Sequence, residues 1–389
     1  MMGGGCPLTA GGERVSHSKP ASARRVSRIC ALFLASVGAC SGAVGADRAH
    51  VVNIFAWPEY FPPALIAKFE AASGMHVNYS VLDSPEAAET ILSVGSSNYD
   101  IVTMNAAPQL GREIPHGFWK ALDPSRIPNA RNADPKIMQL LATVDPGNQH
   151  AVPWMWGTTG IMYNVDKIQA LMPNAPRDSL DMVFKKETAA KFAPCGIGLI
   201  DSWGDILPMV SRYIGQPALS AAPAQLGAVM AKLQEIKPYL QRISTSGYYQ
   251  QLAEGDLCLA IGYSGDALIA RRLVKESHGS IKIDYAFPRE MVPFYIDSMV
   301  IPADSPNVAG ALAFINFVMQ PEISASVTRF IGFATANAAA LPLLEPSIRD
   351  NTVIYPPPGV RERFELQKVY STDEARAFSR AWLQFKSSL

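Results

Sequence analysis

Apolar and polar positions near the start of the chain predict a β-α-β unit. Val51–Phe55 is a β-branched, apolar run that is typical of a buried strand. Two prolines at 62 and 63 suit the first turn of a helix, apolar residues then recur at helical spacing, and Gly74 suits the position after the helix end. His76–Leu82 alternates like a second strand, so we expect a parallel pair with a right-handed crossover.

The same succession of strand and helix patterns continues to the end of the chain. It predicts strands at Tyr99–Met104, Ala151–Asn164, near 196–200 and 257–262, and two within 281–302, with helices from Pro85 to about Val94 and near 165–172, 204–214, 223–236, 307–319, 321–328 and 373–386. No repeat, low-complexity run or long linker separates these segments. The sequence therefore predicts an α/β fold of two lobes that share more than one crossover, with Gly157 and Gly160 at one crossing point.

Residues 1–46 have the pattern of a secretory signal peptide. Arginines at 24, 25 and 28 precede the apolar run Ile29–Ala39, and small residues up to Ala46 form a cleavage site. The apolar run, about 11 residues, is short for a transmembrane helix, although a retained membrane anchor is an alternative. Another alternative is a lipobox at Val37–Cys40, which would leave Cys40 as a lipid anchor. We expect cleavage near Ala46 and a soluble periplasmic protein, with no other segment able to span a membrane; the long stretch before the arginines leaves the true start codon open.

Charge is unevenly distributed, although the 389-residue chain carries 34 basic and 34 acidic side chains. Residues 1–46 hold five of the basic and one of the acidic side chains, so 29 basic and 33 acidic ones remain, a net charge of −4. No stretch of this remainder is basic enough to predict nucleic-acid binding.

Cysteine usage agrees with export. Three of the five cysteines lie in the leader, which leaves Cys195 and Cys258, about 60 residues apart. Two cysteines in an exported chain favour a single disulfide, which the loop-entropy relation makes worth roughly 4 kcal/mol. Two buried free thiols are the alternative.

Sequence motifs of common enzymes and metal sites are absent. The chain has no G-x-S-x-G, no P-loop and no G-x-G-x-x-G after a strand. The histidines after the leader are scattered, without the spacing of a zinc site or a catalytic triad: His50, His76, His116, His150 and His278. We therefore expect no catalytic residue, no metal and no cofactor.

Four acids instead stand out, because each lies beside aromatic residues or glycine where a strand is predicted to end. They are Glu59, Asp205, Asp266 and Asp297. Ligands of open α/β sheets bind in the crevice beyond the carboxyl ends of the strands. Carboxylates and aromatic faces in one crevice suit a ligand with cationic ends and an apolar middle. The alternative is that each acid only caps a helix or a turn.

Six ordered segments, found between residue 51 and about residue 386, carry a resemblance to a known family. They are Phe55–Tyr60 (FAWPEY), Tyr99–Val102 (YDIV), Pro153–Ile161 (PWMWGTTGI), Gly255–Gly262 (GDLCLAIG), Ala334–Asn337 (ATAN) and Ile354–Pro357 (IYPP). The chain resembles the periplasmic spermidine/putrescine-binding proteins of ABC transporters, above all their putrescine-binding branch. The resemblance implies the two-lobed type II periplasmic binding protein fold, with a ligand cleft between lobes that close by hinge motion. We assign the lobes as 47–156 with 276–326, and 157–275 with 327–389.

The resemblance also implies a set of ligand contacts. The principal amine-binding aspartates of the family fall on Asp266 and Asp297, and its disulfide falls on Cys195 and Cys258. The other contacts that it implies are Trp57, Pro58, Glu59, Tyr60, Asn105, Asp205, Tyr263, Tyr295 and Phe333.

Several of these positions depart from the family pattern. Pro58 replaces a hydroxyl residue, Asn105 a serine, Tyr263 a tryptophan, Tyr295 a phenylalanine and Phe333 a tyrosine, while Glu59 and Asp205 exchange one acid for the other. Because the acids remain while half of the lining changes, the sequence favours a cationic amine. It leaves open whether the amine is putrescine, cadaverine, agmatine or spermidine.

We expect a monomer that captures the amine without bond chemistry and presents it to the membrane permease of an ABC importer. Three alternatives remain open. The chain could be the periplasmic amine-sensing component of a signalling system, an enzyme that uses Asp266 and Asp297 as acid and base, or a binding protein for an amino acid or another organic cation.

Overall fold

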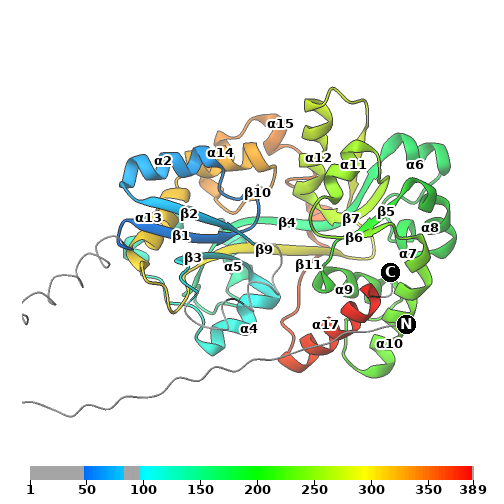
Figure 1. Cartoon of the computed structure of the whole chain (residues 1–389), viewed down its shortest axis with the longest axis horizontal. Helices are drawn as coiled ribbons and strands as arrows, with labels where there is room; N and C mark the ends of the chain where they lie inside the picture. Colours follow the sequence, from blue (N-terminus) through cyan, green and yellow to red (C-terminus); the bar gives the residue numbers. More distant parts are fainter. Residues whose placement is uncertain (1–47, 83–90, 92–96, 388–389) are drawn as a thin grey trace, which may run out of the picture. The chain divides into compact units, whose positions relative to one another are not determined.

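The fold is built on one continuous mixed sheet (Figure 1). The computed structural model describes residues 48–82, 91 and 97–387. The strands run in the order β2-β1-β3-β9-β4-β7-β5-β6, with β8 and β10 paired to β4 and β11 paired to β9. Their bounds are β1 Val51–Ala56, β2 His76–Val81, β3 Ile101–Asn105, β4 Ala151–Asn164, β5 Ile197–Leu199, β6 Arg242–Ile243, β7 Leu259–Tyr263, β8 Ile283–Ala286, β9 Val292–Val300, β10 Ala334–Thr335 and β11 Phe364–Leu366.

Helices cover both ends of this sheet (Figure 1). The α-helices are α2 Pro63–Ser73, α4 Gly111–Glu113, α5 Pro135–Leu141, α6 Val165–Leu171, α7 Asp181–Phe184, α8 Lys186–Phe192, α9 Trp203–Tyr213, α10 Pro223–Ile236, α11 Tyr248–Glu254, α12 Ser264–Glu276, α13 Val308–Val318, α14 Pro321–Ile331, α15 Pro346–Arg349, α16 Pro358–Arg361 and α17 Thr372–Lys386. Shorter helical turns are η1 Ala106–Leu110, η2 Ile114–His116, η3 Pro124–Arg126, η4 Pro128–Asn132, η5 Ala193–Cys195, η6 Lys237–Tyr239 and η7 Ala338–Leu343.

The predicted β-α-β unit at the start of the chain is confirmed. β1 and β2 pair in parallel from Val51 opposite His76 onwards. The intervening helix α2 starts at a proline, and Gly74 adopts a left-handed conformation (φ 70°) directly after it, where a side chain would be strained. The helix predicted from Pro85 to about Val94 lies almost wholly outside the described residues.

Two long strands, β4 and β9, run between the ends of the sheet (Figure 1). β4 pairs with β9 as far as Thr158 and with β7 from Thr159, so its change of partner lies between Gly157 and Gly160. β9 in turn pairs with β3 and with β11. The two ends of the sheet are therefore joined by more than one stretch of chain, as the sequence predicts, while the exact lobe boundaries stay a prediction.

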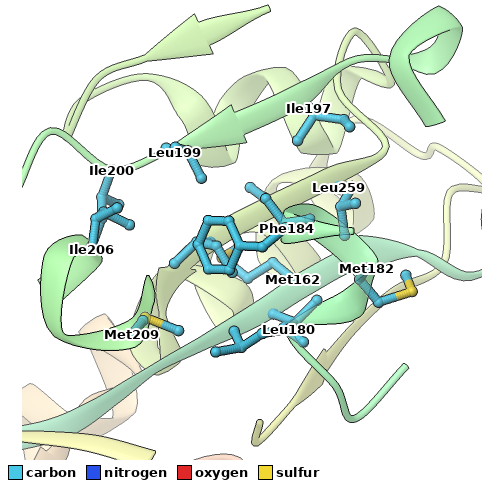
Figure 2. Packing of buried hydrophobic residues seen from close by; sticks show 14 of the residues in the cluster. Met162, Leu180, Met182, Phe184, Ile197, Leu199, Ile200, Ile206, Met209 and Leu259 are labelled. Atoms are coloured by element: carbon cyan, nitrogen blue, oxygen red, sulfur yellow. The ribbon is translucent and has the colours of Figure 1, made fainter. Parts of the chain in front are cut away.

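Each end of the sheet has its own hydrophobic core. Near β5 and β7, Phe184 is fully buried among Met162, Leu180, Leu199 and other apolar side chains (Figure 2). At the other end, the core includes apolar residues of β1, α2, β4 and α13, among them Ile54, Phe69, Trp154 and Phe314. Burial of this kind contributes about 25 cal/mol per Å² of apolar surface, so each end has its own source of stability.

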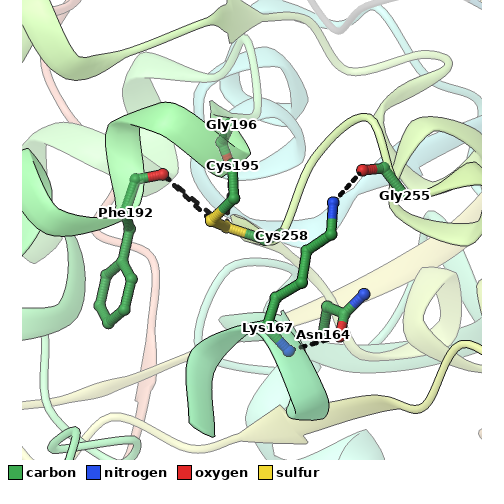
Figure 3. Close-up of a disulfide and its surroundings, with 7 residues drawn as sticks. All are labelled: Asn164, Lys167, Phe192, Cys195, Gly196, Gly255 and Cys258. Carbon is green, nitrogen blue, oxygen red and sulfur yellow. Dashed lines mark hydrogen bonds between the residues drawn. A yellow bond between two sulfur atoms is a disulfide. The ribbon is translucent and has the colours of Figure 1, made fainter. Parts of the chain in front are cut away.

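A disulfide joins Cys195 to Cys258, as the sequence predicts (Figure 3). The two Cα atoms lie 5.4 Å apart, and the bond links the end of η5 to the residue that precedes β7. Beside it, Lys167 Nζ donates a hydrogen bond of 2.6 Å to the carbonyl of Gly255. The disulfide thus fixes the start of β7, the strand that leads to Tyr263 and Asp266.

The leader falls outside the part of the chain that the structure describes, and so do the predicted signal peptide at residues 1–46 and the lipid anchor at Cys40. Within the described residues, no single helix is long and apolar enough to cross a membrane. Helices α13 and α14 are together long and apolar enough for a span, but the chain bends by 76° at the break between them.

Candidate ligand-binding site

A cavity of about 590 Å³ lies beyond the carboxyl ends of β1, β3, β5 and β7. Each predicted contact residue lines it: Trp57, Pro58, Glu59, Tyr60, Asn105, Asp205, Tyr263, Asp266, Tyr295, Asp297 and Phe333. The structure therefore brings the whole predicted set together. Their part in binding a ligand stays a prediction.

Parallel strands account for much of this convergence. β1 is parallel to β3, and β5 is parallel to β7, so the carboxyl ends of each pair meet at one edge of the sheet. Trp57 follows β1 directly, while Asn105 and Tyr263 are the last residues of β3 and β7. Asp205 and Asp266 lie in the first turns of α9 and α12, the helices that follow β5 and β7.

Asp297 reaches the cavity from β9, which is antiparallel to β3 and β4. It is 4% exposed, and among the described residues its carboxylate receives a single hydrogen bond, from the Tyr60 hydroxyl. Burial raises the pKa of Asp297 to about 7, and the charge of Asp205 adds to the rise. The Tyr60 hydroxyl opposes this rise. The Trp57 indole N–H also lowers the pKa of Asp297, although the geometry of its approach to the carboxylate is not that of an ordinary hydrogen bond. Asp297 is thus a buried acid with acceptor positions to spare.

Asp266 has a similar environment. It is 8% exposed, and within the described part of the chain its carboxylate accepts one hydrogen bond, from the Tyr248 hydroxyl. Tyr248 is itself held in place by the backbone N–H of Tyr263, at 2.9 Å. Burial raises the pKa of Asp266 to about 7 against the effect of the Tyr248 hydrogen bond, and the charge of Glu59 adds to the rise. Asp266 therefore also keeps unfilled acceptor positions.

Asp205 is surrounded differently. Its two carboxylate oxygens accept hydrogen bonds from four side chains: Ser202 at 2.6 Å, Thr159 at 2.7 Å, Gln367 at 3.0 Å and Tyr263 at 3.3 Å. Burial raises the pKa of Asp205, and these four donors oppose the rise. Since an ionised carboxylate has about four acceptor positions, Asp205 has little capacity left for a ligand.

Aromatic rings form the walls between these acids. Tyr60 and Phe333 meet edge to face with centroids 5.8 Å apart, and Tyr263 and Tyr295 do the same at 5.3 Å. Phe333 lies directly on Gly265, where an added Cβ would be 2.2 Å from its ring. Such ring pairs hold their faces in fixed orientations, which suits the methylene groups of a ligand.

Glu59 lies at the rim of the cavity rather than inside it. Its side chain is 42% exposed, and its carboxylate is 3.6 Å from Arg272 Nη2. Its backbone is left-handed (φ 64°), which is uncommon for a residue with a side chain. This turn directs the chain from Trp57 to Tyr60, whose hydroxyl reaches Asp297.

The lining as a whole is negatively charged. Five acidic residues line the cavity, Glu59, Asp201, Asp205, Asp266 and Asp297, and no lysine, arginine or histidine is among the described residues that line it. A cleft lined by one sign of charge concentrates ligands of the opposite sign. Across the described ranges, no three His, Cys, Asp or Glu residues are grouped so that they could hold a metal ion. The charge of the lining therefore suits a cationic ligand.

Other lining residues were not predicted from the sequence. Gln367 follows β11 and hydrogen-bonds Asp205, and Trp203 and Tyr249 also line the cavity. Asp201 lines it as well, beside Ser202. Tyr248 supports Asp266 from α11. The acid-plus-aromatic signal that identified the predicted residues is present at Asp201–Trp203, where it could have been extended, but Gln367 has no comparable local signal.

Comparisons with known proteins agree with this geometry. The sequence matches the family described as bacterial extracellular solute-binding protein over residues 64–353. The putrescine-binding periplasmic protein SpuD of Pseudomonas aeruginosa is 38% identical over 357 residues, which cover 92% of this chain and 97% of that protein. The putrescine-binding periplasmic protein PotF of Escherichia coli is 35% identical over 359 residues, which cover 92% and 95%.

A solved structure described as a spermidine/putrescine ABC transporter from Listeria monocytogenes has a TM-score of 0.78 at 27% identity. The match covers 87% of this chain and 100% of the chain in that structure. These matches confirm both the resemblance found in the sequence and the two-lobed type II periplasmic binding protein fold that it implies. One family matches most of the chain, and the relatives are matched over almost their whole length. The chain therefore belongs to the bacterial extracellular solute-binding proteins.

Proposed function

We propose that the chain is an extracytoplasmic receptor for a putrescine-like polyamine, which it delivers to an ABC importer. The observation that supports this most is the state of Asp266 and Asp297. Both are buried, each accepts one hydrogen bond from a phenol, and no basic side chain is among the described residues that line their cavity. Burying an unpaired charge is unfavourable, so these acids favour a ligand that carries the missing cations.

Capture would involve no bond chemistry. One ammonium group binds Asp297 and another binds Asp266, each through charge-assisted hydrogen bonds that are about twice as strong as neutral ones. The methylene chain lies between the rings of Tyr60, Tyr263 and Phe333, and cation–π attraction between a ring face and an ammonium group adds about 0.5–2 kcal/mol. Trp57, Pro58, Glu59, Asn105 and Tyr295 complete the proposed contact set, and Asp205, whose carboxylate is occupied by four donors, holds the wall of the cavity in place.

Proton release accompanies capture in this proposal. Burial raises the pKa of both Asp266 and Asp297 to about 7, so each is partly protonated near neutral pH in the absence of ligand. An ammonium group that hydrogen-bonds the carboxylate favours its charged form and lowers its pKa. Binding near neutral pH then displaces protons into solution.

We place the receptor in the periplasm, to which the signal peptide at residues 1–46 would export it as a monomer. The names of relatives support this location, since both SpuD and PotF are described as periplasmic. Closure of the two lobes over the amine would create the surface that the membrane permease recognises.

The experiment that tests this function is a calorimetric titration of the mature chain at pH 7.5 with putrescine, cadaverine, agmatine and spermidine. 1,4-Butanediol, which has the length of putrescine without its charge, is the matched control. We expect at least one amine to bind with a dissociation constant in the micromolar range or below, and the diol not to bind. Absence of heat and of thermal stabilisation with every amine would contradict the proposal.

A further inference from the structure

Asp201 is an acid of the cavity that the chain itself pairs with an amine. Asp201 is one of the residues that line the cavity, in the loop that ends at Ser202, just before the helix α9 that carries Asp205. Lys386 Nζ lies 2.8 and 2.6 Å from its two oxygens, and the indole N–H of Trp382 donates to it at 2.7 Å. Both partners belong to α17, the last helix of the chain.

This pairing distinguishes Asp201 from the other acids of the cavity. Asp266 and Asp297 each accept a single phenol hydrogen bond among the described residues, and Asp205 is surrounded by neutral donors. Asp201, by contrast, holds an ammonium group of the protein, which is the functional group that a polyamine would offer. While Lys386 is in place, the charge of Asp201 is balanced, and each of its oxygens accepts a hydrogen bond from the Lys386 ammonium group.

From this we infer that Lys386 is a specificity-determining residue, which prevents Asp201 from serving as a third ammonium site and so favours diamines over triamines. The inference rests on the proposed function, because it concerns the number of ammonium groups that the same cavity accepts. With Lys386 in place, the cavity offers two acids with open acceptor positions, those of Asp266 and Asp297. A third ammonium group would have to displace Lys386 from an ion pair that already has two short contacts.

The pair also has a purely structural explanation, in which it only fastens α17 to the loop before α9. The two explanations differ in what they predict for ligands. A fastening role changes stability, and it changes the affinity for every amine by the same factor. A specificity role changes the ratio of triamine to diamine affinity.

The test is calorimetric titration of Lys386→Met in the full mature chain with putrescine and with spermidine. We expect the ratio of spermidine to putrescine affinity to rise by about 2- to 5-fold, the range that a partly exposed ion pair provides. Arg376→Met is the matched control, since it makes the same charge change on the same helix at an exposed residue, paired loosely with Asp373 at 3.8 Å. It should leave the ratio unchanged. The double variant Lys386→Met with Asp201→Asn should lose the gain.

Asp201→Asn alone provides an independent test if Lys386→Met fails to fold. It leaves the Lys386 ammonium beside the cavity without a counter-charge, so it should weaken spermidine binding more than putrescine binding. If the wild-type chain binds putrescine but neither variant changes the ratio, the inference is wrong while the proposed function stands. If the wild-type chain binds no amine, the proposed function fails first.

Discussion

Asp205 and Asp297 line the same cavity and are both 4% exposed, yet their surroundings differ. Asp205 accepts hydrogen bonds from four side chains, whereas Asp297 accepts one from the described residues. A buried polar group gains stability when its hydrogen bonds are complete and loses it when they are missing. We therefore expect the number of donors to distinguish an acid that stabilises the fold from one that is available to a ligand.

Three of the four donors of Asp205 also come from distant parts of the chain. Thr159 lies on β4, Ser202 directly precedes α9, Tyr263 ends β7 and Gln367 follows β11. Asp205 thus joins four segments at one point, while Asp297 is attached to Tyr60 and Asp266 to Tyr248. We expect the first acid to matter for folding and the other two to matter for binding.

The largest expected effect is the loss of putrescine affinity when one of the two open acids is replaced. Replacing Asp297 or Asp266 by Ala should weaken putrescine binding by about 100-fold or more, because it removes a buried partner of the ligand charge, worth roughly 2–5 kcal/mol. Asp205→Ala should weaken binding less, by about 10-fold. Calorimetry at pH 7.5 measures all three. A greater loss at Asp205 than at Asp297 would reverse our assignment of these acids.

Stability of the ligand-free chain should show the opposite order. Asp205→Ala leaves four donors without their acceptor and should lower the free energy of unfolding by about 2–4 kcal/mol. Asp297→Ala removes an unpaired buried charge and leaves one phenol without its partner, so it should change that free energy by less than about 1 kcal/mol. Urea denaturation without ligand tests this order, and equal destabilisation by the two substitutions would show that donor number does not separate them.

Acidity should weaken binding and strengthen the ligand-free fold. The pKa of Asp266 and of Asp297 is about 7 in the folded chain, above the ordinary value of an unfolded aspartate. Between about pH 4 and pH 7 the folded chain therefore binds more protons than the unfolded chain, so the stability contributed by these two groups falls as pH rises through this window. A cation must displace the same protons, so affinity should fall by up to about tenfold per pH unit and per group below pH 7.

Titrations with putrescine at pH 5.5, 6.5, 7.5 and 8.5 test this dependence, with melting of the ligand-free chain at the same values. The double variant Asp266→Asn with Asp297→Asn is the control, because the slope of ligand-free stability that these two groups contribute should disappear. Calorimetry in two buffers with different heats of ionisation should also detect protons released on binding near pH 7. An affinity that stays constant from pH 5.5 to 8.5 would contradict the raised pKa of the two aspartates.

We expect a smaller difference in putrescine affinity between variants of two tyrosines, Tyr60 and Tyr263. Tyr60→Phe removes the hydroxyl donor of Asp297, raises the pKa of that carboxyl further, and should weaken putrescine binding at pH 7 by about 3- to 10-fold. Tyr263→Phe removes one of the four donors of Asp205, the longest at 3.3 Å, and should weaken binding by less than about 3-fold. Calorimetry of the two variants compares them, and equal losses would show that the two acids respond alike.

Much of the fold could be predicted because local patterns specify it. The helix between Pro63 and Gly74 has a defined start, an apolar period and a defined end, so its limits follow from the sequence. The 14-residue strand β4 has the bounds predicted for it. α12 was missed because it begins at Ser264 and Gly265, two residues that favour turns, and because Gly265 is required there by contact with Phe333.

The candidate site was only partly predictable. The strand-end pattern indicated the four acids, the resemblance added the aromatic residues and the other contacts, and the structure places all of them in one cavity. Neither supplied the number of donors around each acid, because most of those donors lie far away in the sequence; Gln367 is 162 residues from Asp205. The pairing of Asp201 could likewise not be predicted, since Lys386 is 185 residues away. Which acid is free to bind a ligand thus depends on tertiary structure.

A crystal structure of the mature chain with bound putrescine would decide which acids hold the ligand. We expect one ligand nitrogen within about 3 Å of the Asp297 carboxylate and the other within the same distance of Asp266, with Asp205 still bound to its four donors. A ligand whose ammonium groups contact Asp205 or Asp201 and leave both Asp266 and Asp297 without a cation would contradict this division of the acids.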